Sequence, residues 1–496
     1  MTETPKPATL VDALTPVAVL ICLLGLSVYL YGDNSSYGAN QIALLIAGGV
    51  AALIGIKNGH GWAGIEAGIV RGISSALGAI LILLAVGSLI GTWILAGTVP
   101  TMIYFGLQII NPAFFYVTSC LICVLVSVTI GSSWTTAGTV GVALIGISHG
   151  LGLPLEITAG AIISGAYFGD KMSPLSDTTN LAPAVSGTDL FSHIGHMVWT
   201  TTPSILLALL IFLVIGLSGD GTATETDMSA TLSVLEQHFN IDILTLVPMV
   251  LVLGMAYKKV PAFPTIMIGA LLGGGVAVLL QPQAVAAFAA DSSHSDVLRN
   301  LDAVWTALFD GFSITTDNPA VNDLLSRGGM SSMLNTVWLI LCALTFGSIL
   351  EQTGLLQRLV LSALKLVHGT GSLITTVIFT CIGTNIMTGD QYIGIVLPGR
   401  MFKAEFARRG LDPKNLSRTL EDSATITSAL IPWNTCGAYM ASTLGVATFA
   451  YLPFAFFNLI NPFVAILYAM MNFRIVPLEV SAESPEVAES ADSQPG

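Results

Sequence analysis

The sequence predicts an all-α protein that crosses a membrane many times. Hydrophobic residues make up 53% of its 496 positions, charged residues make up only 9%, and the mean hydropathy is +0.80. Soluble domains carry about 25% charged residues, because a surface in contact with water must be largely polar. This composition excludes a large soluble α/β enzyme. A membrane β-barrel is excluded as well, since the alternating pattern of its strands is missing from the sequence.

The apolar residues gather in runs that are separated by polar stretches. The runs lie at 14–31, 39–56, 77–96, 111–130, 139–151, 155–168 and 198–218, and then at 240–257, 262–280, 335–352, 371–388, 423–444 and 446–472. A helix needs about 20 apolar residues to cross a bilayer. Several runs reach that length, whereas others are short and interrupted by glycine. On this basis we expect about 11–13 membrane segments.

Polar ends and one polar gap divide the chain. The expected organisation is a cytoplasmic amino terminus (1–13), a first membrane repeat (14–218), a polar linker (219–240), a second membrane repeat (241–473) and an acidic disordered tail (474–496). Beyond Arg474 the tail holds acidic residues and no Lys or Arg, a composition typical of disorder. Two less apolar segments, 61–76 and 297–330, are expected to lie at the membrane interface or to re-enter the membrane.

Three motifs recur in the same order in both halves, which indicates an internal duplication. AVGSLIGT (85–92) matches TFGSILEQ (345–352), TIGSSWTTAG (129–138) matches CIGTNIMTGD (381–390), and SPLSDTT (173–179) matches LIPWNTCG (430–437). Basic residues in short loops mark the cytoplasmic side. With the basic loops placed inside, the second half starts on the opposite side from the first. The prediction is two inverted repeats, each with a re-entrant hairpin and a broken helix.

Polar residues at the two expected hairpin tips are the first candidates for a site. Ser132 and Ser133 interrupt the apolar runs of the first half, and Asn385 and Asp390 occupy the matching place in the second. Hydroxyl, amide and carboxylate oxygens are hard donors that suit an alkali cation. Alternatively, small residues at these places only pack helices closely, and Asp390 is a structural acid near the membrane edge.

The strongest candidates lie where charge and broken backbone coincide. Charged residues at membrane depth are expensive and usually serve a function, and Pro174 interrupts the helix there. Asp177 is followed by the hydroxyl of Thr178. An ionised carboxylate binds a cation and a protonated one does not, so we expect Asp177 to take up either Na+ or H+. Asp170 is either a second titrating group or the ion-pair partner of Lys171.

The matching stretch of the second half carries less charge. Asn434 takes the place of Asp177 in the repeat and Thr435 follows it, so the second half is expected to contribute neutral ligands. Glu421 and Asp422 come shortly before them in the sequence. These two acids either offset the dipole at the start of a helix or take part in transport.

The cysteines and histidines indicate no disulfide or metal site, and the net charge indicates no nucleic-acid binding. The six cysteines all lie in apolar stretches and are expected to be buried hydrophobes rather than disulfides or a zinc site. His193 and His196 have no further metal ligands near them and are expected to make ordinary hydrogen bonds. The net charge is −13 and no basic surface is evident, which argues against nucleic-acid binding.

These motifs resemble those of the NhaC-type sodium/proton antiporter family, whose relatives include malate–lactate antiporters. The resemblance lies in GAYFGDKMSPLSDTTNLAP and GSSWTTAGT of the first half and in GTNIMTGDQY and EDSATITSALIPWNTCGAY of the second, and it extends over about 14–472. It implies exchange of Na+ for H+ across the bacterial inner membrane. It also implies a homodimer in which scaffold helices form the interface beside a mobile transport domain.

Residues and resemblance together predict a secondary transporter rather than an enzyme. Asp177 is expected to be the main carrier of Na+ and H+, with Asp170 and Asp390 as second titrating groups. The neutral Na+ ligands are expected to be Ser132, Ser133, Thr178, Asn385, Asn434 and Thr435. Na+ is the cargo, so no cofactor is expected, and the partners are Na+, H+ and the lipid bilayer.

Two other functions compete with this prediction. The first is organic-anion exchange, such as malate for lactate, in which Lys171 or Arg400 supplies a cationic contact. The second is an intramembrane aspartyl protease that uses Asp170 and Asp390 to activate water. The protease leaves the tandem halves and the polar hairpins unexplained.

Overall fold

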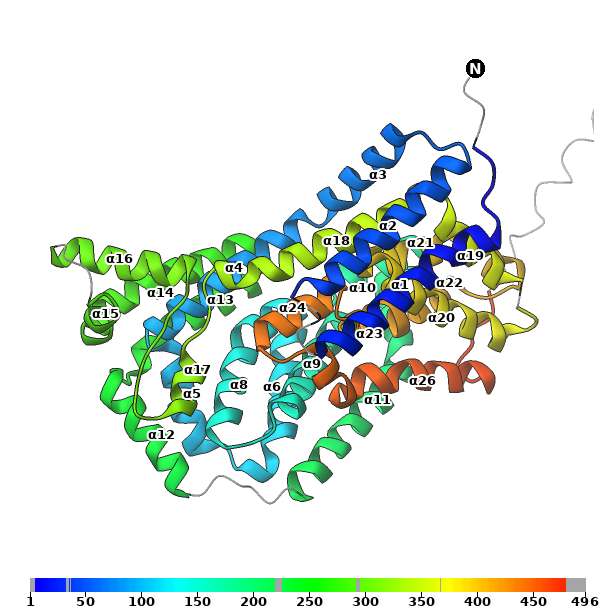
Figure 1. The fold of residues 1–496 in the computed structure, drawn as a ribbon. Coiled ribbons are helices and arrows are strands. Elements are labelled where there is room, and N and C mark those ends of the chain that lie inside the picture. Colours follow the sequence, from blue (N-terminus) through cyan, green and yellow to red (C-terminus); the bar gives the residue numbers. More distant parts are fainter. Residues whose placement is uncertain are drawn as a thin grey trace, which may run out of the picture.

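The computed structural model describes residues 5–32, 35, 37–218, 225–290, 295–365 and 367–478. Regular structure in these ranges is helical, and the β-pairing within them consists of two isolated bridges, Phe312–Arg327 and Leu411–Pro477. Figure 1 shows the helices packed around one another along the whole molecule. The predicted all-α class is therefore confirmed.

The helices of the first half begin soon after the amino terminus. They are α1 (Leu10–Tyr31), α2 (Ala39–Lys57), α3 (Trp62–Ser75), α4 (Leu77–Leu95), α5 (Thr98–Ile109), η2 (Pro112–Phe114), α6 (Phe115–Ile130), α7 (Ser133–Thr136), η3 (Ala137–Gly141), α8 (Val142–Gly150), α9 (Leu155–Met172), α10 (Asp177–Ser186) and α11 (Leu190–Ser218). The η3 segment is a π-helical turn, and it joins α7 and α8 into one continuous arm.

The remaining helices begin within the predicted linker. They are α12 (Glu225–His238), η4 (Ile243–Leu246), α13 (Val247–Tyr257), α14 (Ala262–Leu280), α15 (Pro282–Phe288), α16 (Asp296–Phe309), α17 (Pro319–Leu325), η5 (Ser331–Met333), α18 (Leu334–Gln352), α19 (Leu355–Leu364), α20 (Thr370–Thr388), α21 (Gln391–Arg408), α22 (Pro413–Leu420), η6 (Glu421–Thr425), α23 (Ile426–Ser428), α24 (Thr435–Leu444), α25 (Thr448–Tyr451), η7 (Leu452–Phe454) and α26 (Phe456–Met470). The polar linker 219–240 thus contains a helix, α12. The acidic residues predicted to be a disordered tail lie outside the described residues from 479 onward.

Many of these helices have the length and composition of membrane spans. Among the described residues, eight are long and apolar enough to cross a bilayer, or up to ten if two bent pairs each count as one span. The expected 11–13 segments also included interrupted runs, such as 139–151 and 423–444, which the structure divides into shorter helices. The protein is a multi-pass membrane protein.

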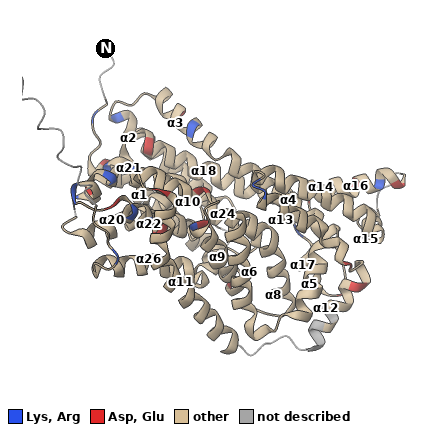
Figure 2. Ribbon diagram, turned by 180° about the vertical axis from the view of Figure 1, so that it is seen from behind, with Lys and Arg blue, Asp and Glu red and all other residues tan. Residues whose placement is uncertain are grey.

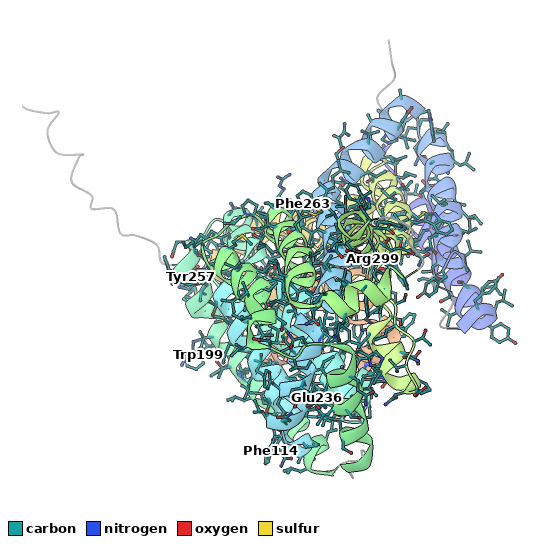
Figure 3. The ribbon with its side chains drawn as sticks, turned by 90° about the vertical axis from the view of Figure 1, so that its left-hand side faces the viewer. Phe114, Trp199, Glu236, Tyr257, Phe263 and Arg299 are labelled. Carbon is teal, nitrogen blue, oxygen red and sulfur yellow. The ribbon has the colours of Figure 1, made fainter. Side chains whose placement is uncertain are left out.

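Large apolar side chains cover the outside of the molecule. Phe114, Trp199 and Tyr257 lie at its margin (Figure 3) and are 48%, 41% and 67% exposed. Water tolerates such surfaces poorly when they are extensive, whereas a lipid environment accepts them. Cys22 on α1 is exposed as well, contrary to the expectation that all six cysteines are buried, and the other five are buried and free.

The helices form two layers (Figure 1). In the first, which we call the scaffold layer, α2 and α3 pack on α18, while α14 and α16 pack on α4. The second, which we call the core layer, contains the hairpin of α6 with α7–α8, the hairpin of α20 with α21, and the helices α9, α10, α11, α22, α24 and α26. The polar candidates of the sequence all lie in the core layer.

The two halves run through a similar order of elements. α4 and α18 are each 19 residues long, and each is followed by a left-handed glycine, Gly97 or Gly354, at the start of the next helix. α14 packs on α4 as α2 packs on α18. These matches agree with the predicted duplication, and the inverted orientation of the two repeats stays a prediction.

Two glycines bring α9 unusually close to α6. Gly165 and Gly169 lie four residues apart and face α6, where an added Cβ atom would overlap the carbonyl oxygen of Cys120 or the backbone of Ser127. Small residues at this spacing let helix backbones approach each other inside a membrane. The glycines of the GAYFG stretch therefore fix the position of the carboxyl end of α9, which carries Asp170.

Candidate functional site

The tip of the first hairpin lies against the break that follows α9. Gly131 ends α6 with a φ of +77°, and a Cβ atom there would lie 2.7 Å from the carbonyl carbon of Leu175 and 2.9 Å from the amide nitrogen of Ser176. Ser132 then caps the next helix, since its hydroxyl accepts a hydrogen bond from the Thr135 amide at 3.2 Å. Glycine is required here both by the left-handed turn and by the close approach.

The tip of the second hairpin repeats this arrangement. Gly389 ends α20 with a φ of +65°, and Asp390 caps α21 by accepting a hydrogen bond from the Ile393 amide at 3.0 Å. The amide of Thr435 donates to the Gly389 carbonyl oxygen at 2.8 Å, so this tip lies against the start of α24. Asp390 is thus the positional counterpart of Ser132. The sequence match paired Ser132 with Thr384 and placed Asn385 at the tip, but Asn385 lies inside α20, so that match was wrong by six residues.

Each half also contains a helix broken at a proline. Residues 173–176 separate α9 from α10, and residues 429–434 separate α23 from α24. Ser176 precedes the first residue of α10, Asp177, just as Asn434 precedes Thr435. The structure therefore matches Asn434 with Ser176 and Thr435 with Asp177. The predicted pairing of Asn434 with Asp177 was wrong by one residue, because Pro174 and Pro432 each lie three residues before the first residue of the next helix.

Asp170 ties the first tip to the first break. Its buried carboxylate accepts hydrogen bonds from the Ser133 amide at 3.2 Å, from the Ser133 hydroxyl, and from the Ser176 hydroxyl at 3.4 Å. Its carbonyl oxygen accepts from Thr178 at 3.2 Å and from Thr179 at 2.5 Å. The alternative in which Asp170 pairs with Lys171 was wrong, since Lys171 points elsewhere.

A cavity of about 810 Å³ opens where the tips and breaks meet. It is lined by six of the predicted site residues: Ser132, Asp170, Asp177, Thr178, Asp390 and Thr435. The Asp177 side chain is exposed to this cavity and makes no hydrogen bond or ion pair with any residue that the structure describes. Lys259, in the connection between α13 and α14, also lines the cavity. Three carboxylates therefore converge on one space with a single described cation beside them.

Three predicted ligands lie behind the cavity wall. Ser133 is buried against Asp170. Asn385 donates to the Ala424 carbonyl oxygen at 2.6 Å, while its own Oδ1 has no hydrogen-bond partner among the described residues. Asn434 accepts from the Cys436 amide at 3.0 Å and donates to the Asn385 carbonyl oxygen at 3.4 Å. Both amides thus support the second tip, and their role as Na+ ligands stays a prediction.

Sequence reasoning missed a second charged cluster in the core layer. Lys171 is fully buried and donates to the Asp422 carboxylate and to Asn461 at 2.9 Å. Arg418 approaches the other oxygen of Asp422 at 3.8 Å. Figure 2 shows that most of the ribbon carries no charged residue and that blue and red residues meet around α22 and α24. The pairing across 251 residues of sequence left no local signal.

Two further expectations about this region need correction. Glu421 and Asp422 do not start a helix, because α22 already begins at Pro413 and continues through η6, where both acids are fully buried. Neither Lys171 nor Arg400 lines the cavity, so neither supplies the cationic contact expected for an organic anion. His193 makes the ordinary hydrogen bond that was expected, to the Ser417 hydroxyl at 2.7 Å.

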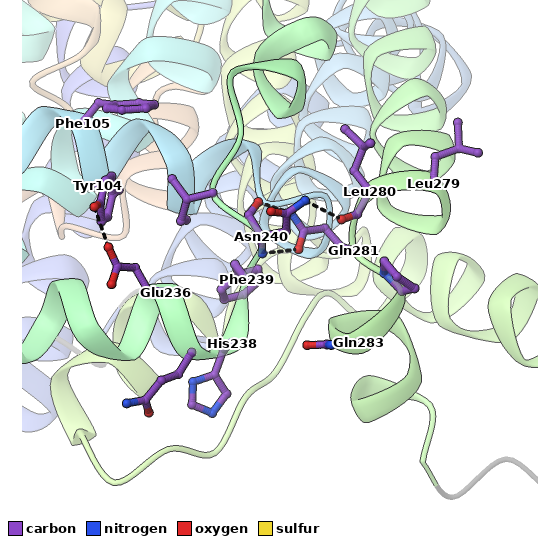
Figure 4. A pocket seen from close by; sticks show the side chains of 13 residues that line it. Tyr104, Phe105, Glu236, His238, Phe239, Asn240, Leu279, Leu280, Gln281 and Gln283 are labelled. Atoms are coloured by element: carbon purple, nitrogen blue, oxygen red, sulfur yellow. Dashed lines mark hydrogen bonds between the residues drawn. The ribbon is translucent and has the colours of Figure 1, made fainter.

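Two other cavities contain none of the predicted site residues. One, of about 830 Å³, lies beside α12 (Figure 4), where Tyr104 donates to Glu236 at 2.6 Å and Asn240 forms two hydrogen bonds with Gln281 at 2.8 Å. The other, of about 570 Å³, is lined by the start of α18, by Pro432 and by α24. Its lining includes Ser35, Tyr37 and Ile90 of the first half and contains neither hairpin tip.

This multi-pass membrane protein has polar hairpin tips and broken helices that meet around an acidic cavity. Such an arrangement defines the class of secondary transporters. Comparison with known proteins agrees with this class. Residues 165–473 match the model of the Na+/H+ antiporter family, and the chain belongs to this family.

Its relatives align with it over almost their whole length. The Na+/H+ antiporter NhaC of Alkalihalophilus pseudofirmus is 40% identical over 88% of this chain and 91% of its own. An uncharacterized Na+/H+ antiporter of Haemophilus influenzae is 40% identical over 96% of this chain and 99% of its own. The malate-2H+/Na+-lactate antiporter of Bacillus subtilis is 40% identical over 86% of this chain and 88% of its own.

Proposed function

We propose that this protein exchanges Na+ for H+ across the bacterial inner membrane and that Asp177 is the residue that captures the ion. The observation that carries this proposal is the position of the Asp177 carboxylate. It lacks a hydrogen-bond or ion-pair partner among the described residues, and it faces a cavity that Asp170 and Asp390 also line. The names of the relatives and the family support the same exchange.

The surrounding groups suit a weakly held alkali cation. Asp177 and Asp390 supply carboxylate oxygens, while Ser132, Thr178 and Thr435 supply hydroxyl or carbonyl oxygens along the same wall. Such hard oxygen donors replace the water around an alkali cation, whereas soft ligands favour other metals. Asp170 is already held by Ser133 and Ser176, so it serves better as a second titrating group than as the first ligand.

Competition for the same carboxylate couples the two ions. An ionised Asp177 attracts Na+, and protonation removes the charge that holds it, so bound Na+ and bound H+ exclude each other. Exchange further requires that the site face each side of the membrane in turn.

The test is Na+-driven proton movement in proteoliposomes. Asp177→Asn keeps the size of the side chain but removes its charge, and we expect exchange to fall at least about 100-fold, since the ion loses its principal charged ligand. Asp302→Asn, at an exposed position of α16 far from the cavity, is the matched control and should transport normally. Normal exchange by Asp177→Asn would contradict the proposal.

Organic-anion exchange is the second candidate, because one relative is named a malate–lactate antiporter. The cavity offers three carboxylates and one lysine, Lys259, which disfavours a dicarboxylate as the sole cargo. Malate or lactate added to the same vesicles should leave the flux unchanged. Stimulation by either anion would favour this candidate instead.

The expected homodimer also stays a proposal. The scaffold layer is the surface offered for it, since α1 and α2 expose large apolar side chains such as Ile21, Leu26 and Leu53. The mass of the protein in a mild detergent measures this directly. A particle that contains one chain at all protein concentrations would contradict the dimer.

A further inference from the structure

Glu421 is a buried acid that the proposed exchange does not use. Its side chain is fully inaccessible, and neither carboxyl oxygen has a hydrogen-bond partner among the residues that the structure describes. The hydroxyl of Thr425, one turn further along, adjoins the carboxyl group without reaching hydrogen-bond geometry. An isolated carboxylate in such a place is very unfavourable, whereas a neutral carboxylic acid is tolerated. The environment in this structure therefore suits the protonated form.

The backbone around Glu421 is also unusual. Residues 421–425 form a π-helical turn between α22 and α23. Such turns are rare and occur often at functional sites. The first-half counterpart of this stretch is α9, which precedes the other break and is an α-helix without a π-helical turn. The π-helical turn is therefore found at the stretch that carries the buried acid and is not repeated in the matching stretch of the first half.

Charged groups approach Glu421 from several elements. Lys171 and Asp170 come from α9, and Asp422 and Arg418 lie on the same helical stretch. The helices packed against residues 421–425 carry further titratable groups, among them Cys381 on α20, Tyr392, Arg400, Lys403 and Glu405 on α21, Lys414 on α22, Tyr167 on α9, Asp177 on α10 and Tyr468 on α26. His193 and His196 lie on α11, which packs on α22. Asn461 and Thr200 hold Asp422 in place through hydrogen bonds of 2.9 and 2.8 Å.

The charges of this cluster do not balance without one further ionised acid. Lys171 and Arg418 are two cations, and Asp422 is one anion, which leaves a single buried positive charge. An ionised Glu421 compensates it. Asp170 lies near Glu421, and its negative charge opposes the ionisation of Glu421, so the charges of these two acids are linked. Asp170 faces the cavity and Glu421 does not, so an ion that enters the cavity acts on Glu421 through this balance.

We propose that Glu421 is a second proton-binding residue of the transport cycle, which releases its proton when Na+ neutralises the carboxylates of the cavity. The proposal rests on the Na+/H+ exchange proposed above and adds its stoichiometry. With Na+ bound, the charge of Asp170 no longer opposes the ionisation of Glu421, and the O–H bond of Glu421 breaks so that its carboxylate compensates the buried cations. The proton leaves to the water of the cavity. When Na+ departs, Glu421 takes a proton back.

This cycle moves two protons against one Na+: one from the cavity carboxylate and one from Glu421. One net charge therefore crosses the membrane in each turnover, and the membrane potential acts on it. We call the pH difference at which net exchange stops the balance point. At zero potential and with an about tenfold Na+ gradient, the balance point is about half a pH unit for two protons per Na+ and about one pH unit for one-to-one exchange. The balance point therefore gives the number of protons exchanged per Na+.

The experiment measures that balance point in proteoliposomes, with the potential clamped by valinomycin and K+. The wild type should balance at about half a pH unit, and the point should shift when the clamped potential changes. Glu421→Gln mimics the neutral acid, and we expect it to exchange at about one pH unit with no response to potential. Glu66→Gln, at an exposed position of α3, is the matched control and should behave as the wild type does.

Three results would overturn the inference. They are a wild-type balance at about one pH unit, a wild type that ignores the potential, and a Glu421→Gln variant that keeps the wild-type balance point. If that variant does not transport, proton release on Na+ addition to the detergent-solubilised protein decides. We expect about two protons per bound Na+ from the wild type and about one from Glu421→Gln, and equal release from both would contradict the inference. Complete absence of Na+-driven proton movement in the wild type is a different failure, since it refutes the exchange itself.

Discussion

The buried ion pair between Lys171 and Asp422 makes a quantitative prediction about stability. Both side chains are completely inaccessible, and Arg418 is the second cation beside the same acid. Asp422→Asn removes the acid that both buried cations approach, so at least one of them is left without an acid partner. Breaking a buried pair in this way costs about 3–5 kcal/mol, because the remaining charge stays uncompensated. We therefore expect this variant to be among the most destabilising single changes in the core layer.

The opposite change is expected to be milder. Lys171→Met removes a cation but leaves Arg418 3.8 Å from Asp422 as compensation. The remaining loss is that of a hydrogen bond to a charged group, about 1.5–3 kcal/mol. Combining Lys171→Met with Asp422→Asn should recover part of the stability lost in Asp422→Asn alone, because one of the two buried cations is then gone.

Thermal unfolding in detergent compares these variants. In a chain of this length 1 kcal/mol corresponds to roughly 2 °C in Tm, so Asp422→Asn should melt about 6–10 °C below the wild type and Lys171→Met about 3–6 °C below. Asp302→Asn again controls for the loss of an acid at an exposed position. An Asp422→Asn variant that melts within about 2 °C of the wild type, or above Lys171→Met, would refute the reasoning.

Two further predictions concern the cavity. Gly131→Ala forces a Cβ atom into a left-handed turn and against the backbone at Leu175, so we expect a loss of at least about 1–2 kcal/mol in stability together with reduced transport; an unchanged Tm would contradict the close approach of tip and break. Lowering the pH should raise the apparent KM for Na+ by up to about tenfold per unit, because H+ competes for Asp177. Na+-dependence curves at two pH values measure this, and a KM independent of pH would argue against a shared carboxylate.

The sequence predicted well those features that have a local cause. Composition alone gave the all-α membrane class, and the polar tips and proline breaks were located because glycine, proline and hydroxyl residues interrupt long apolar runs. Six of the nine predicted site residues line one cavity, since both tips and both breaks meet there. Each of these features is visible within a window of about ten residues, the range over which backbone preferences act.

Features that depend on distant partners were missed. One of the two alternatives for Asp170 paired it with Lys171, although the structure pairs Lys171 with Asp422 on another helix. Arg418 was not among the predicted site residues, whereas it is fully buried near the same acid. Glu421 was expected at the start of a helix, whereas the helix that contains it begins eight residues earlier, at Pro413. The sequence around a charged residue does not show which distant residue of opposite charge it contacts in the fold.

The two clusters nonetheless share one helix. Asp170 and Lys171 are consecutive on α9, and consecutive residues of an α-helix point about 100° apart. Asp170 therefore reaches the hairpin tip and the cavity, while Lys171 reaches Asp422 and Asn461 in the core layer. Gly165 and Gly169 hold the same helix tightly against α6. Because Asp170 is held by the tip and Lys171 by the buried pair, an ion that changes the charge of one cluster acts on the other through a single rigid turn of helix.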